Sequence, residues 1–191
     1  VLGLNGLAIW RKAQGVDPSP VVAFNERKSI STERTFARDT TDVAKLQGML
    51  VAMAENLAYQ LRRGKKVTAC VTVKVRYADF DTRSMQARIP YSAADHVLIP
   101  KVQELFQRLY DRRVRVRLIG IRFSHLVGGG TQMDLFEDTE ERSNLYQALD
   151  RIRNRFGDRS VVTAAGMEAR TIGRSNPFNG DAPLLLANRH Q

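Results

Sequence analysis

Arginine recurs in one short stretch of the chain with a spacing that suits phosphate binding. Arg113, Arg115 and Arg117 occupy alternate positions in a segment otherwise rich in branched aliphatic residues, and Arg122 follows. Successive side chains of a β-strand point to opposite faces, so this spacing places guanidinium groups on one face and aliphatic groups on the other. A guanidinium group donates paired hydrogen bonds to phosphate oxygens. Residues 112–123 are therefore predicted to form a strand that binds an anionic ligand.

The alternation in this strand breaks before Arg122. Leu118, Ile119, Gly120 and Ile121 interrupt it, so we predict a β-bulge near Gly120 that returns Arg122 to the basic face. A half-buried strand with a solvated arginine face would show the same pattern. The other strands must therefore decide between the two interpretations.

A single pair of carboxylates has a spacing that could suggest metal-dependent catalysis. Asp79 and Asp81 flank Phe80 between two apparent strands, where Asp is typical of turns. No third carboxylate accompanies them in a recognisable context, and two-metal catalysis needs a set of acidic ligands. Cys70 and the three scattered His residues fit neither a zinc set nor a nucleophile with its base. We predict no catalytic residue, metal or cofactor in this chain.

Hydrophobic periodicity predicts the elements that carry these side chains. Apolar residues at three- and four-residue steps indicate helices over 42–64 and 95–109, and alternation indicates strands over 27–36, 66–77 and 82–91, in addition to 112–123. The resulting β-α-β-β-α-β order predicts an α+β, ferredoxin-like fold, in which a four-stranded antiparallel sheet has both helices on one face. The opposite face is left bare.

The bare face of the sheet is predicted to be basic and polar. Residues 27–126 contain 20 Lys and Arg against 9 Asp and Glu, a surplus of 11, although the formal charge of the whole chain is +10. A local surplus of this size favours a polyanion such as nucleic acid. A single-strand RNA reader would need outward aromatic side chains for base stacking. None is expected here, so phosphates of a duplex are the favoured ligand.

The segments around this domain carry further signals. A short helix is expected over 6–14, followed by an extended tether over 21–26, and a glycine-rich leash over 127–131. Gln132, Met133, Asp134, Leu135 and Phe136 follow directly and are typical of a short motif that docks in a hydrophobic pocket of a partner, although Leu135 and Phe136 could instead pack on their own domain. A C-terminal helical extension (140–156) and a strand at 160–165 are expected within residues 139–168, and residues 169–191 have the composition of a disordered tail.

The sequence resembles the C-terminal part of Y-family translesion DNA polymerases, closest to the bacterial DNA polymerase IV group. The matching residues are Lys28 to Ser31, Thr35-Phe36, the hairpin from Asp79 to Arg88, and Arg117 to Ser124, in that order. The resemblance implies that residues 27–126 form the little finger, which lies in the major groove of DNA, and that residues 1–20 end the preceding thumb. It also implies that residues 132–136 bind the sliding clamp, with Met133 where Leu is commoner.

The resemblance also implies roles for individual residues. The residues it suggests as candidates for DNA contact are Ser29, Ser31, Thr32, Thr35, Ser84, Gln86, Arg115, Arg117 and Arg122. Lys28, Arg34, Lys74, Arg76 and Arg88 extend the same basic set. The catalytic carboxylates and their Mg²⁺ would belong to a palm upstream of Val1.

We therefore expect a duplex-binding and clamp-docking region of a cytoplasmic lesion-bypass polymerase, acting beside its own catalytic core and without a membrane. A catalytically inactive, polymerase-like accessory protein and a non-polymerase RNA-binding module are the alternatives.

Overall fold

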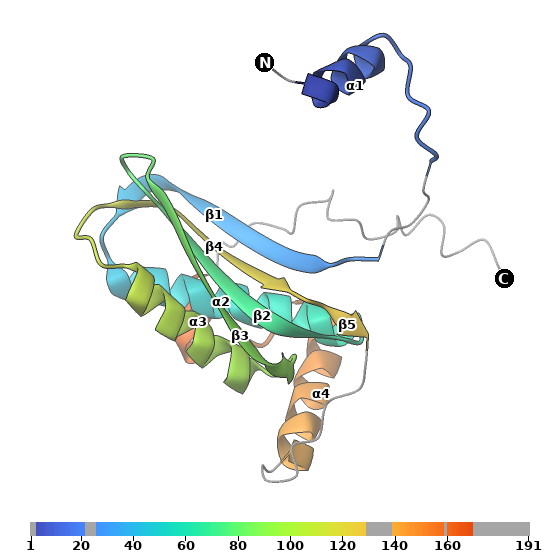
Figure 1. Ribbon diagram of the computed structural model, residues 1–191. Coiled ribbons are helices and arrows are strands. Elements are labelled where there is room, and N and C mark those ends of the chain that lie inside the picture. Colours follow the sequence, from blue (N-terminus) through green and yellow to red (C-terminus); the bar gives the residue numbers. More distant parts are fainter. Residues whose placement is uncertain (1–2, 22–25, 129–138, 159, 170–191) are drawn as a thin grey trace, which may run out of the picture.

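The computed structural model describes residues 3–21, 26–128, 139–158 and 160–169. Its centre is an antiparallel sheet covered on one face by two helices (Figure 1). The strands of the sheet are β1 (Ser29–Thr40), β2 (Lys66–Tyr77), β3 (Thr82–Ser92) and β4 (Val116–Ser124), and the two-residue β5 (Val127–Gly128) pairs with the start of β2.

The strands lie in the order β1-β4-β2-β3, and every pairing is antiparallel. The chain forms two β-α-β units, one from β1 to β2 and one from β3 to β4, whose strands alternate in the sheet. β4 lies between β1 and β2, and β2 lies between β3 and β4. A ferredoxin-like sheet has its first and third strands at the centre, whereas here β4 and β2 are central. The α+β class and the element order agree with the sequence prediction, and the strand order corrects its ferredoxin-like part.

Two amphipathic helices form the second layer of the fold. They are α2 (Val43–Arg63), whose N-cap Asp42 accepts a hydrogen bond from the Lys45 amide at 3.0 Å, and α3 (Asp95–Leu109). Their apolar stripes pack on the inward side chains of the sheet in one core, which includes Leu50, Leu57, Val73, Leu98, Phe106, Ile121 and Phe123. This core lies on one side of the sheet, and no helix of the described residues packs on the other side.

The C-terminal elements pack against α2. They comprise α4 (Thr139–Phe156), which meets α2 through the hydrogen bonds Tyr59–Asn154 and Arg62–Asp150, and the 3₁₀-helix η1 (Ala164–Ala169). The strand predicted at 160–165 is wrong, because this segment packs on a helix and meets no strand edge there. A Cβ added at Gly48 of α2 would lie 2.8 Å from the Ala165 carbonyl oxygen, so the two backbones approach closely. The extension therefore lies on the helical side of the domain.

The N-terminal helix α1 (Gly3–Ala13) lies apart from the sheet (Figure 1). It starts before the predicted residue 6, and its large apolar side chains, Leu7, Ile9 and Trp10, are exposed. No described helix has the length and apolar composition needed to cross a membrane. Residues 129–138, which include most of the leash, and residues 170–191 of the tail lie outside the described residues.

Candidate nucleic-acid interface

The side chains that point away from α2 and α3 define a surface that we call the outer face. Directly paired residues of antiparallel strands point to the same side, so the register arranges this face in rows across β1, β4, β2 and β3. The rows are Ser29–Ser124–Cys70–Arg88, Ser31–Arg122–Thr72–Gln86, Glu33–Gly120–Lys74–Ser84 and Thr35–Leu118–Arg76–Thr82.

The rows bring most of the predicted contact residues together on one surface. All four strands contribute to the set, which consists of Ser29, Ser31, Thr35, Lys74, Arg76, Ser84, Gln86, Arg88 and Arg122. The rows contain no aromatic residue, as the sequence predicts. The described C-terminal elements, α4 and η1, contact α2 on the other side of the sheet and not this face.

Other predicted contact residues lie elsewhere. Thr32 and Arg34 pair with the core residues Ile121 and Ile119, so they point toward the helices. The prediction placed all polar residues of 27–36 on one face, although successive side chains of a strand point to opposite faces. Lys28 and Arg115 are exposed but precede β1 and β4.

Arg117 occupies a β-bulge. Arg76 pairs with Leu118, whereas its neighbour Tyr77 pairs with Val116, so Arg117 is the extra residue on β4. The bulge predicted near Gly120 therefore lies at Arg117, and Gly120 belongs to a regular part of the strand. Leu118, and not Arg117, consequently occupies the outer-face position in this row.

An acidic side chain on the outer face was not foreseen. Glu33 reaches across Gly120 to Lys74, with 2.9 Å between the carboxylate oxygen and the ammonium nitrogen. A Cβ at position 120 would lie 2.8 Å from the Glu33 Cγ, so the glycine leaves room for this ion pair. Extending the alternation through Ser31 and Thr35 would have revealed Glu33, and the strand register adds Ser124 and Thr82, which sequence reasoning also missed.

Two arginines on the outer face remain available to a ligand. Arg88 and Arg122 are exposed, and neither forms an ion pair with any residue that the structure describes. Lys74 is paired with Glu33, and the Arg76 guanidinium donates to the Thr82 hydroxyl at 2.7 Å. Among the described residues, the outer face thus combines two guanidinium groups that lack an ion pair with hydroxyl and amide groups spread over its rows.

Comparison with known families identifies the domain that contains this sheet. Residues 27–135 match the impB/mucB/samB family C-terminal domain. The chain belongs to this family. Its matching domain is the little finger of Y-family polymerases, and residues 29–124 supply the sheet described above.

Several curated relatives of the little-finger chain are called DNA polymerase IV. The protein from Clostridium acetobutylicum is 30% identical over 86% of this chain and 42% of its own length. Those from Desulfatibacillum aliphaticivorans and Methanoculleus marisnigri are 34% and 36% identical, over 85% and 69% of this chain and 43% and 36% of their own lengths. The chain therefore spans about two fifths of these relatives.

One solved structure is also similar to the little-finger chain. It is entitled "Complex of beta-clamp processivity factor and little finger domain of PolIV", and it is 20% identical, with a TM-score of 0.44 over 57% of this chain and 99% of that one.

The carboxylates at the β2–β3 turn of the little finger bind arginine. Arg112 donates to Asp79 at 2.9 Å and to Asp81 at 2.8 Å. A hydrogen bond from the Asp81 amide, together with Arg112, lowers the pKa of Asp79, despite the opposing effect of desolvation. These contacts support the turn interpretation, because both carboxylates are engaged by a cation. Within the described residues, no group of three or more His, Cys, Asp or Glu could hold a metal ion.

Proposed function

We propose that this chain is the part of a lesion-bypass DNA polymerase that holds the template-primer duplex and docks on the sliding clamp. The observation that carries the proposal is the outer face, a helix-free surface with hydroxyl, amide and guanidinium groups in register across four strands. The membership of residues 27–135 in the family supports it.

The dimensions of the outer face suit the major groove. Three inter-strand spacings of about 4.8 Å make a four-stranded face about 14 Å wide, close to the groove width of about 12 Å. Its hydroxyls and cations would lie along the phosphates on both sides of the groove. Such contacts fix the position of a protein without reading bases, so binding would be largely independent of sequence.

Competition between nucleic acids tests this function. The 191-residue chain is mixed with a labelled duplex DNA, and unlabelled duplex DNA or single-stranded RNA of equal length is added as competitor. We expect the duplex to displace the label at lower concentration, because the outer face lacks the aromatic platform that single-strand RNA readers use. Preferential displacement by RNA would favour the alternative of an RNA-binding module.

The clamp-docking part of the proposal rests on Gln132 to Phe136, which lie outside the described residues. Replacing Leu135 and Phe136 together with Ala should abolish binding to a bacterial sliding clamp, measured by surface plasmon resonance, because these two residues supply the apolar anchors. Affinity for duplex DNA should stay unchanged. Equal loss of both activities would mean that the two side chains stabilise the domain.

The parent protein would supply the chemistry. We propose that its catalytic core holds Mg²⁺, and that the exposed apolar side chains of α1 pack against that core. A polymerase-like accessory protein that lacks catalytic carboxylates would share the same outer face. Primer extension by the full-length protein separates the two candidates, since only an active polymerase incorporates nucleotides.

A further inference from the structure

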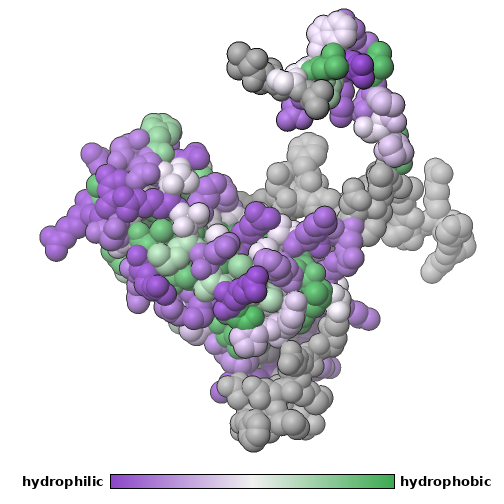
Figure 2. All heavy atoms as spheres, viewed as in Figure 1, coloured by the Kyte–Doolittle hydropathy of each residue, from purple (hydrophilic) through white to green (hydrophobic). Residues whose placement is uncertain are grey.

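The turn between β2 and β3 presents an aromatic ring to solvent. Phe80 is 64% exposed at the tip of the hairpin, and its backbone φ is +66°. Bulky residues rarely adopt a positive φ, and such strained positions cluster at binding and catalytic sites. Figure 2 shows hydrophobic surface protruding at this tip from largely hydrophilic surroundings. The tip thus combines backbone strain with an exposed aromatic side chain.

Hydrogen bonds hold this turn in a fixed conformation. The Phe80 amide donates to the Tyr77 carbonyl at 3.0 Å, and the Tyr77 amide donates to the Asp81 carbonyl at 2.9 Å. The Ala78 amide donates to the Arg115 carbonyl at 2.8 Å, which ties the turn to the segment before β4. The ring is therefore presented on a rigid support, and less entropy would be lost when it binds a ligand.

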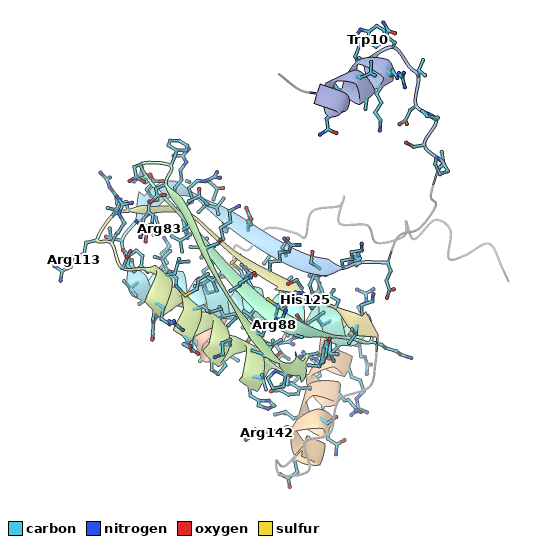
Figure 3. The ribbon with its side chains drawn as sticks, viewed as in Figure 1. Trp10, Arg83, Arg88, Arg113, His125 and Arg142 are labelled. Carbon is cyan, nitrogen blue, oxygen red and sulfur yellow. The ribbon has the colours of Figure 1, made fainter. Side chains whose placement is uncertain are left out.

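A guanidinium group lies against the ring. That of Arg117 is 4.8 Å from the centre of the Phe80 ring, and one of its nitrogens is 3.9 Å from a carboxylate oxygen of Asp39. Asp79 and Asp81 are bound by Arg112, so their charges are compensated. Arg113 projects from the same end of the molecule, opposite the end that carries Arg142 (Figure 3). An exposed aromatic ring with an adjacent guanidinium group is a combination that stacks on nucleobases.

We propose that Phe80 and Arg117 form a stacking site for an unpaired nucleobase next to the duplex held by the outer face. This inference rests on the proposed function. Arg117 precedes Leu118, and the outer-face row of Leu118 ends at Thr82, two residues after Phe80, so the site adjoins the outer face. The aromatic platform that the outer face lacks is thus supplied at its end. The site distinguishes DNA with an unpaired extension from a fully paired duplex.

Fluorescence of 2-aminopurine tests the stacking site. The probe is a duplex with a single-stranded extension whose first unpaired base is 2-aminopurine, and the reference is the same duplex with blunt ends. The unaltered chain is expected to quench the fluorescence and to prefer the extended DNA about tenfold, a value typical of one stacked base. Phe80→Gly should abolish both the quenching and the preference, with unchanged affinity for the blunt duplex.

The choice of glycine separates binding from folding. Glycine adopts a positive φ without strain, so Phe80→Gly should keep or raise the melting temperature while it removes the ring. Tyr91→Ala is the matched control, because Tyr91 is also an exposed aromatic residue of β3 but lies at the other end of that strand. This control should keep the preference.

The binding results separate failure of the stacking site from failure of the proposed duplex-binding function. If the unaltered chain binds extended and blunt DNA equally, or if Phe80→Gly keeps the preference, the stacking site is wrong and duplex binding stands. If the chain binds neither DNA, the proposed function itself fails.

Discussion

Replacing Arg62 with Ala is expected to lower the free energy of unfolding by about 3–5 kcal/mol, the cost of removing one partner from a buried ion-pair network. Arg62 lies near the end of α2, where its guanidinium donates to Asp95 of α3 at 2.7 Å and to both carboxylate oxygens of Asp150 of α4, at 2.7 and 2.9 Å. It also donates to the Ala93 carbonyl at 2.9 Å. A single side chain therefore connects three helices.

The cost is large because the partners of Arg62 are shielded from water. The side chains of Arg62, Asp95 and Asp150 are only 15%, 11% and 16% exposed. Without the guanidinium, two carboxylates of this region would keep their desolvation penalty and lose their main counter-charge. Because α4 is held to α2 partly through Asp150, the variant should also expose α4 to proteolysis before the domain unfolds.

The effect of Arg62→Ala should depend on pH. Burial raises the pKa of Asp95 above its ordinary value of 3.8, although Arg62 opposes the rise. Between pH 3.8 and the raised pKa of the folded state, the folded protein therefore binds more protons than the unfolded chain. The free energy of unfolding falls as the pH rises through this range. Loss of Arg62 raises the pKa of Asp95 further. The deficit should thus be largest near pH 7 and shrink on acidification toward the ordinary pKa.

Urea denaturation at several pH values measures this effect. Arg63→Ala is the matched control, since Arg63 is the next residue of α2 but is exposed, and its replacement should change the stability by less than about 0.5 kcal/mol. Equal losses for the two variants, or an Arg62→Ala deficit that does not vary with pH, would contradict the role given to this network.

Local patterns in the sequence were sufficient to predict α2, α3, four strands and the bare face, although β4 begins at Val116, four residues after the predicted residue 112. The apolar stripe of α2 and the alternation along β2 and β3 are regular, so these elements appear within a few residues of their predicted bounds. Most outer-face residues follow from the same alternation. The bulge and the strand order could not be predicted in this way, because both depend on which strands pair and in which register.

The C-terminal region shows a second limit of local patterns. Ser160 to Ala165 has the composition of a strand, but strand formation requires an available edge, whereas this segment packs on the small residues of α2. Glu33 shows a third limit of local patterns. The basic surplus of residues 27–126 hid this single acidic residue, and only the strand register reveals that it lies across Gly120 from Lys74. Pairings between distant residues thus decide which cations are free.

Replacing Arg88 and Arg122 together with Ala is expected to reduce the affinity for duplex DNA about a hundredfold, about tenfold for each arginine. Each guanidinium is exposed on the outer face without an ion pair to any described residue, and a hydrogen bond to a charged group contributes about 1.5–3 kcal/mol. The double variant should also shallow the plot of log affinity against log salt by about 1.8, which corresponds to two phosphate contacts at about 0.9 each. Fluorescence anisotropy over a range of salt concentrations measures both quantities.

Two matched variants separate this effect from a general change in charge. Arg108→Ala removes an exposed arginine from α3, on the opposite side of the sheet, and should leave the affinity nearly unchanged. Glu33→Gln should act in the opposite direction, because it removes a negative charge from the outer face and releases Lys74. We expect higher affinity and a salt slope steeper by about 0.9. If Arg108→Ala weakens binding as much as an outer-face variant does, the duplex is held by overall charge, and the rows across the four strands are not its binding surface.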